Sequence, residues 1–142
     1  MKMIRAAFLL LLCATVGMTA AGAAEREEKV VYHINDSSVA TAALNNIRNH
    51  LNASPKAKII VVTHGPGIDF LLEGAKNKNG NPYDAVVQEL VNRNVQFRVC
   101  NNTLETRKID KSQVIQEATI VPSGVAEVAR LQIQEGYAYI KP

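Results

Sequence analysis

The sequence has few of the residues that cross-link small secreted proteins or build large aromatic cores. Of its 142 residues only two are cysteine and none is tryptophan, and aromatic residues make up 5% of the chain. Two cysteines cannot form a disulfide-rich scaffold. Charged residues account for 20% of the chain and carry both signs, which excludes a disordered acidic or basic polypeptide. The length allows one domain with a removable segment and excludes a large multidomain enzyme.

Motifs for several common chemistries are also missing. The sequence contains no G-x-x-x-x-G-K-[ST] loop for nucleotide phosphates and no G-x-S-x-G turn for a nucleophilic serine. Its cysteine and histidine residues have none of the short spacings found in metal sites. We therefore expect no metal and no other cofactor.

The first 24 residues have the organisation of a secretory signal peptide. Lys2 and Arg5 precede an apolar run over residues 6–16, and small residues follow that run. We predict cleavage before Glu25, which would export a domain of residues 25–142 to the periplasm. The apolar run is short for a membrane span, so we expect no stable span after cleavage. An uncleaved N-terminal anchor is the alternative.

Removal of this segment changes both the charge and the cysteine count. The full chain has 16 Lys+Arg against 13 Asp+Glu and a formal net charge of +3. Without Lys2 and Arg5 the net charge falls to +1, and Cys100 becomes the single cysteine. A nearly neutral domain has no basic stripe to neutralise a phosphate backbone, so we expect no nucleic-acid partner.

Apolar runs alternate with helical periodicity along the exported part of the chain. Five strands are predicted, over residues 29–35, 58–63, 95–100, 119–121 and 137–140. Helical segments are predicted between them: a helix after residues 36–38, a helical turn over 68–75, and helices from 82, over 103–108 and over 124–134. This alternation predicts a three-layer α/β/α domain with a mostly parallel five-stranded sheet in a flavodoxin-like layout.

The polar residues at the ends of the predicted strands are the candidates for a site. In open parallel sheets, ligands bind at the carboxyl ends of the strands. We take two residues there as candidate catalytic residues, Cys100 and His64. We take five more as candidate substrate-binding residues: His33, Asn35, Gly65, Asn101 and Asn102.

Cys100 is the sharpest of these features. It precedes a predicted helix for which Asn102 is the expected N-cap and Glu105 completes a capping box. The free N–H groups and the dipole at a helix start favour a thiolate, which is a nucleophile toward sulfur and disulfides. His64 would act as a base or hydrogen-bond donor near the thiol. Structural roles are the alternatives: a buried small residue for Cys100, a capping residue at a strand end for His64, and a satisfied core residue for His33.

Three segments resemble the DsrE/DsrF-like family of sulfur-relay proteins. They are VVTHG at the end of the second predicted strand, FRVCNNTL around Cys100, and the C-terminal run from Val121. The resemblance covers essentially all of residues 25–142. It implies a three-layer domain that assembles into homo-oligomers, often trimers or hexamers, and a cysteine at the position of Cys100 that carries sulfane sulfur as a persulfide. The relay members that thiolate tRNA or supply sulfite reductase are cytoplasmic, so an exported member needs other partners.

Two functions are therefore in view. The first is a periplasmic sulfur carrier or sulfurtransferase-like protein, in which a small sulfur donor or a partner protein transfers sulfur to Cys100. The Asn101 or Asn102 amides would stabilise the resulting persulfide, and His64 would tune its protonation. The alternative is a non-catalytic homo-oligomeric module for small-ligand binding or assembly, with a structural Cys100. A single-cysteine redox sensor is a weaker third possibility. Faces with few charges, around Val86/Val87 and Val125/Val128, leave room for subunit contacts.

Overall fold

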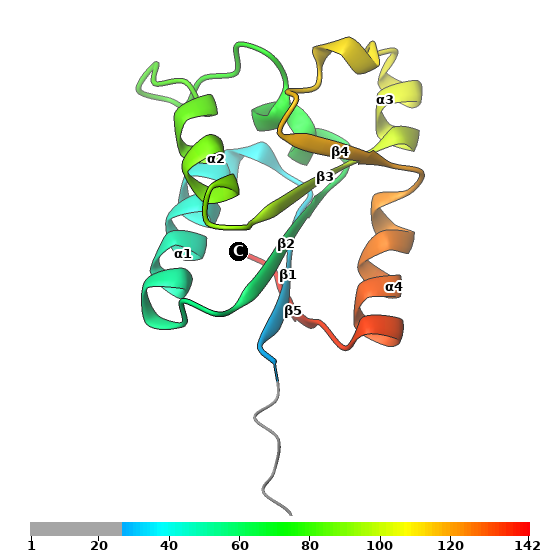
Figure 1. Ribbon diagram of the computed structural model, residues 1–142. Coiled ribbons are helices and arrows are strands. Elements are labelled where there is room, and N and C mark those ends of the chain that lie inside the picture. The colour runs from blue at the N-terminus through cyan, green and yellow to red at the C-terminus, as the bar shows by residue number, and fades with distance from the viewer. Residues whose placement is uncertain (1–26) are drawn as a thin grey trace, which may run out of the picture.

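Five parallel strands form the sheet at the centre of the molecule (Figure 1). The structure, a computed structural model, describes residues 27–142. The predicted signal peptide and its cleavage site lie outside the described residues. Within them, no helix is both long enough and apolar enough to cross a membrane. The strands are β1 (Lys29–Ile34), β2 (Lys58–Thr63), β3 (Gln96–Cys100), β4 (Ala118–Val121) and β5 (Ala138–Ile140).

The order of the strands across the sheet is β4-β3-β2-β1-β5. The predicted α/β class and parallel five-stranded sheet are confirmed, but this order differs from the 2-1-3-4-5 order of flavodoxin. The first three connections each advance by one strand in the same direction, and the last returns past β1 to add β5. Because right-handed connections that run in opposite directions place their helices on opposite faces, the reversal gives the sheet its second covering layer.

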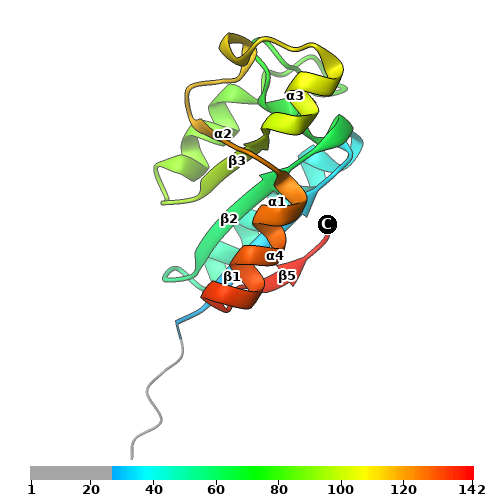
Figure 2. The same cartoon turned by 90° about the vertical axis from the view of Figure 1, so that its right-hand side faces the viewer.

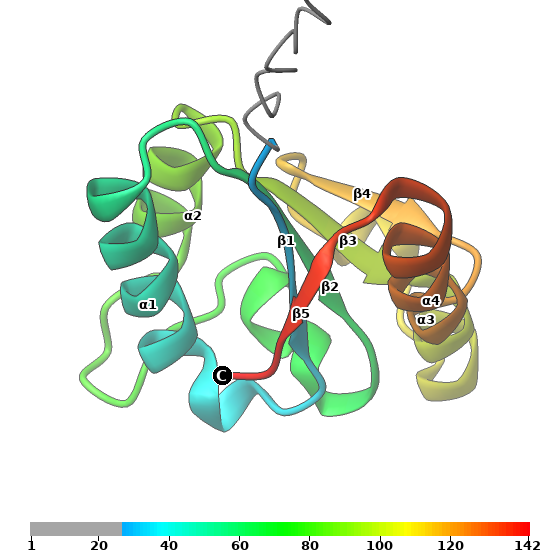
Figure 3. The same ribbon diagram turned by 90° about the horizontal axis from the view of Figure 1, so that it is seen from below.

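The helices on the first face are α1 (Ala40–Ala53) and α2 (Asp84–Val91), which Figure 3 shows together on one side of the sheet. The 3-10 helix η2 (Gly65–Leu71) completes this layer and adds Ile68, Phe70 and Leu71 to the core. The buried residues of α1 recur at spacings of three and four, as its periodicity predicts; they are Ala40, Ala43, Leu44, Ile47 and Leu51.

The opposite face is covered by α4 (Gly124–Glu135), which lies in front of the sheet in Figure 2. Val128 and Leu131 of α4 pack on a small cluster of sheet residues. An ion-pair network also holds α4 to β3: Glu127, whose side chain is 12% exposed, binds both Arg98 and Arg130. Hydrogen bonding from Arg130, followed by the charge of Arg98, holds the pKa of Glu127 below its ordinary range despite burial.

Three further short helices lie in the segments that connect the strands: η1 (Ser37–Val39), α3 (Asn101–Arg107) and η3 (Lys111–Gln113). The helical turn predicted over 68–75 is η2, which begins earlier, at Gly65. The capping box predicted for α3 is wrong. Cys100 is the N-cap and Asn102 already lies inside the helix, so Asn101 Nδ2 instead donates to Glu105 Oε1 at 2.7 Å.

A close backbone contact fixes where η2 lies. A β-carbon added to Gly67 would be 2.1 Å from the carbonyl oxygen of Ile34, so only glycine lets η2 rest on the end of β1. His64 N–H also donates to Ile34 O at 3.3 Å. The end of β2 and the start of η2 are thereby held against the end of β1, beside the edge of the sheet where the strands terminate.

Candidate functional site

The carboxyl ends of β1, β2 and β3 lie side by side at one edge of the sheet. Ile34 pairs with Thr63, and Thr63 pairs with Val99, so the residues that follow these strands emerge together. Gly124, the first residue of α4, lies on the same edge. A β-carbon there would be 3.0 Å from Thr63 O, 3.1 Å from His64 Cβ and 3.2 Å from Cys100 Cβ. The absence of a side chain at Gly124 therefore lets α4 begin directly above the cysteine.

A pocket of about 450 Å³ opens beside the thiol. Its walls come from the end of β2 and the start of η2, from α3, and from the first turn of α4. The cysteine is only 3% exposed, yet it lines this pocket together with His64, Asn102 and Thr103. A small molecule that enters the pocket can reach the sulfur.

The surroundings of the thiol stabilise its ionised form. Burial raises the pKa of Cys100, but hydrogen bonds from Gly124 N–H, from the hydroxyl and N–H of Thr103, and from Asn102 N–H outweigh burial and leave the pKa below its ordinary value. The Thr103 oxygen accepts a hydrogen bond from Gly65 N–H at 2.9 Å. Its own hydrogen is therefore free to point at the sulfur.

Two histidine rings stack beside the pocket. The rings of His33 and His64 have centroids 4.8 Å apart and planes 29° apart. His33 Nδ1 is hydrogen bonded to the Tyr139 hydroxyl at 2.7 Å, and its Nε2 is buried without a partner among residues 27–142. Burial, followed by the charges of His64 and Lys141, lowers the pKa of His33. His33 is therefore uncharged at neutral pH, and its ring packs against the ring of His64, which lines the pocket.

Arg107 supplies a positive charge to the pocket. It lines the pocket, and its guanidinium donates to Asp69 Oδ1 at 2.5 Å and to Gly65 O at 3.3 Å. The Asp69 carboxylate compensates part of this charge, but both side chains are more than a third exposed. Arg107 thus fixes the start of η2 and favours the binding of an anionic ligand near the sulfur.

The structure brings together most, but not all, of the predicted site residues. Asn35 and Asn101 do not line the pocket. Asn101 Nδ2 is bound to Glu105, and its Oδ1 is buried without a partner in the described part of the chain. His33 reaches the pocket only through its stack with His64. The four predicted residues that line it are Cys100, His64, Gly65 and Asn102.

Other contributors to the site were not predicted from the sequence. Thr103 carries a local signal, because it lies one helical turn after Cys100 and so can reach back to it. Gly124 and Tyr139 carry no local signal. The chain reverses direction across the sheet after β4, and this reversal brings α4 beside β3 and β5 beside β1. In the part of the chain that the structure describes, no three His, Cys, Asp or Glu residues form a group that could hold a metal.

We predict that Thr103→Val raises the pKa of the Cys100 thiol by about one unit, because the variant loses a hydrogen bond to the thiolate. Thr103→Ser keeps the hydroxyl and should titrate like the parent. The measurement is the rate of alkylation by iodoacetamide against pH, in a Cys13→Ser background so that only Cys100 reacts. Identical profiles for the Val and Ser variants would show that the hydroxyl does not act on the sulfur.

We also predict that His64→Asn raises the pKa of His33, because the charge of His64 is one cause of its lowering. Lys141→Gln should raise it by less, since Lys141 is the smaller charged contributor. Burial persists in both variants, so His33 should still titrate below about 6.5. An NMR titration of the His33 ring measures this, with Lys56→Gln as a remote control. An unchanged pKa in His64→Asn would contradict the coupling.

Comparison with known proteins places the chain in a family. MTH1491 from Methanobacterium thermoautotrophicum, described as a protein of unknown function, is 30% identical, with a TM-score of 0.73 over 82% of this chain and 100% of that chain. The ychN protein from E. coli is 15% identical, with a TM-score of 0.67 over 81% and 99%, and shares the fold. No curated protein matches the chain. The sequence model of the DsrE/DsrF-like family matches residues 18–142, and the chain belongs to this family.

Proposed function

We propose that this protein is a periplasmic sulfur carrier that holds sulfane sulfur as a persulfide on Cys100. The observation that carries the proposal is the environment of the thiol. It is nearly buried, it lines a pocket, and N–H groups from α3 and α4 lower its pKa. Membership of a sulfur-relay family supports the same function.

The chemistry proposed is the transfer of one sulfur atom to the thiolate. Cys100 Sγ attacks the outer sulfur of a polysulfide or thiosulfate donor, so that an Sγ–S bond forms and the S–S bond of the donor breaks. The electron pair of that bond leaves with the rest of the donor, as a shortened polysulfide or as sulfite. No external oxidant or reductant is needed, because the sulfur is already in the sulfane state.

The residues around Cys100 have distinct roles in this step. The N–H groups of Gly124 and Thr103, which favour the thiolate, would stabilise the negative persulfide in the same way. Arg107 attracts the anionic donor to the pocket. His64, which lines the pocket, provides a proton to the departing group or to the bound persulfide.

Export is the second part of the proposal. It rests on the N-terminal sequence, in which Lys2, Arg5 and the apolar run of residues 6–16 have the organisation of a signal peptide. An exported carrier would exchange sulfur with a donor and an acceptor outside the cytoplasm. Small inorganic sulfur compounds are small enough to enter the pocket. A partner protein would receive the sulfur by a similar attack on the persulfide.

Mass spectrometry tests the persulfide. After incubation with polysulfide, the Cys13→Ser chain should carry an adduct of ~32 Da that dithiothreitol removes. Cys100→Ser in the same background should carry none. If the folded protein gains no adduct while the unfolded chain does, the thiol is structural. The non-catalytic binding or assembly module would then be the better description.

Assembly into a homo-oligomer is the third part of the proposal. Val87 and Val128, which the sequence suggested for subunit contacts, are buried within the chain. The exposed apolar residues of α4 are Val125, which is 62% exposed, and Ile133, which is 83% exposed. They lie two helical turns apart and so form one stripe on the outside of α4. A second copy that covered this stripe would also border the Cys100 pocket, because Val125 lines it.

We predict that the full chain sediments as a trimer or hexamer at micromolar concentration. Ile133→Asp should weaken this assembly, because it places a charge in a contact that excludes water. Gln134→Asp adds the same charge at the neighbouring exposed position of α4 and should leave the sedimentation coefficient unchanged. A monomeric parent protein in analytical ultracentrifugation would contradict the proposed assembly.

A further inference from the structure

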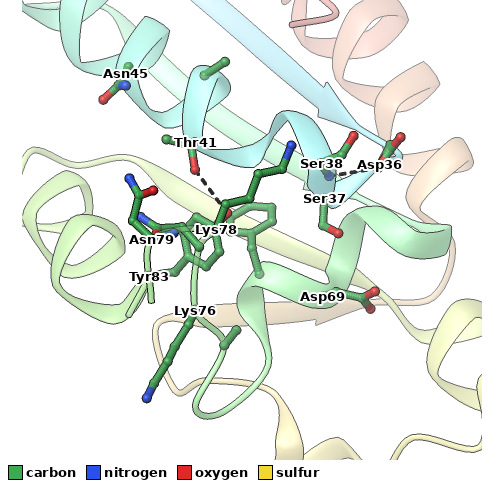
Figure 4. A pocket seen from close by; sticks show the side chains of 14 residues that line it. Asp36, Ser37, Ser38, Thr41, Asn45, Asp69, Lys76, Lys78, Asn79 and Tyr83 are labelled. Carbon is green, nitrogen blue, oxygen red and sulfur yellow. Dashed lines mark hydrogen bonds between the residues drawn. The ribbon is translucent and has the colours of Figure 1, made fainter. Parts of the chain in front are cut away.

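A second and larger pocket, of about 670 Å³, opens near the carboxyl end of β1 (Figure 4). Its walls come from residues 36–38, from the first turns of α1, from the end of η2, and from the segment over residues 75–83. This volume lies within the range of small-molecule sites. The two pockets share η2 as a wall, since Gly65 and Pro66 line the Cys100 pocket while Asp69 and Phe70 line this one. None of the predicted site residues lies in it.

The acidic side chains of the second pocket are already engaged. Asp69 accepts a hydrogen bond from Arg107 at 2.5 Å. Asp36 accepts Ser38 N–H at 2.8 Å as the cap of η1, and that backbone hydrogen bond is the main cause that lowers the pKa of Asp36. Both carboxylates are therefore held by partners within the protein rather than left for a cationic ligand.

The lysine side chains of the pocket, in contrast to its carboxylates, are not engaged in ion pairs within residues 27–142. The cations that line the pocket are Lys76 and Lys78, and its carboxylates are Asp36 and Asp69. The charge of Asp69 is compensated by Arg107, which lines the Cys100 pocket. In Figure 4 the side chain of Lys78 reaches across the pocket toward Ser37 and Ser38, whereas Lys76 extends away on another side. Lys78 is thus the cation placed to meet a ligand.

The rest of the lining suits a hydroxylated ligand. Ser37, Thr41 and Asn79 present hydroxyl and amide groups to the pocket. Beneath them Tyr83 and Phe70 pack edge to face, with ring centroids 5.6 Å apart, and the Tyr83 hydroxyl is hydrogen bonded to Thr41 Oγ1 at 3.2 Å. The tyrosine is thereby fixed in place, and the hydrogen-bonding groups of the wall are arranged before any ligand arrives.

We propose that this pocket binds a small organic anion with a hydroxylated body. The ammonium group of Lys78 binds the phosphate or carboxylate, and Ser37, Thr41 and Asn79 bind the hydroxyl groups. The position agrees with the general rule that open parallel sheets bind ligands at the carboxyl ends of their strands. The positive end of the α1 dipole adds to the attraction for an anion. This inference does not depend on the chemistry of Cys100.

NMR titration of the full chain with glycerol 3-phosphate tests the proposal, with inorganic phosphate and glycerol as probes that each lack one half of the ligand. We expect saturable shifts at the backbone amides of residues 36–45 and 75–83 at millimolar concentration. Phosphate should bind about fivefold more weakly, and glycerol should cause no shift. Lys78→Gln should weaken glycerol 3-phosphate binding by about tenfold, whereas Lys56→Gln should not.

Four outcomes would overturn the assignment. They are the absence of saturable shifts, shifts of equal size with glycerol, phosphate binding as tight as glycerol 3-phosphate binding, and unchanged binding by Lys78→Gln. The Cys100→Ser variant distinguishes binding in this pocket from binding in the Cys100 pocket. If it leaves the titration unchanged, the anion site is independent of the thiol. If it abolishes the shifts, the ligand lies in the Cys100 pocket and the second site is refuted.

Discussion

The approach of α4 to the ends of β2 and β3 is the contact on which the site depends. A β-carbon at Gly124 would lie 3.0 to 3.2 Å from atoms of Thr63, His64 and Cys100 at once, which is tighter than ordinary van der Waals contact, so these neighbours would have to move by a few tenths of an ångström. Overpacking at such a position costs about 1–3 kcal/mol or displaces the helix. The same contact brings the Gly124 N–H to the thiol and closes one side of the pocket. The network of Glu127 with Arg98 and Arg130 holds the helix in this position one turn later.

The carboxyl edge of the sheet is divided into two compartments by η2. Gly67 seats this segment on the end of β1, and Arg107 ties it to α3 through Asp69 and the carbonyl of Gly65. One compartment holds a thiol with a lowered pKa and a pair of stacked histidines. The other holds Lys76 and Lys78, which form no ion pair within residues 27–142, among hydroxyl and amide groups. Because η2 contributes a wall to both pockets and Arg107 binds Asp69, the geometries of the two pockets are linked although their chemical groups differ.

Much of the fold could be predicted because the local pattern of apolar residues indicates which side chains are buried. The run KIIVVT forms a strand with the predicted bounds, Lys58–Thr63, since β2 lies between β1 and β3 and is apolar along almost its whole length. The buried face of α1 is likewise the one that its periodicity predicts. The start of α3 was misjudged, because the backbone turns helical directly after Cys100 and leaves no place for Asn102 as a cap. The strand order was not predictable, since periodicity says which faces are apolar and not which strands are neighbours.

Local sequence patterns alone specify the alternation of strands and helices, the near-neutral charge of residues 25–142, and the position of Cys100 at the end of a strand. These properties depend on neighbouring residues and on the period of apolar side chains. The groups that surround that cysteine are set instead by the packing of distant segments. The Gly124 N–H, the stack of His33 on His64, and the pocket around Lys78 join segments that are distant in the chain. Their convergence follows from the strand order and from the handedness of the connections, and no local pattern encodes either of these.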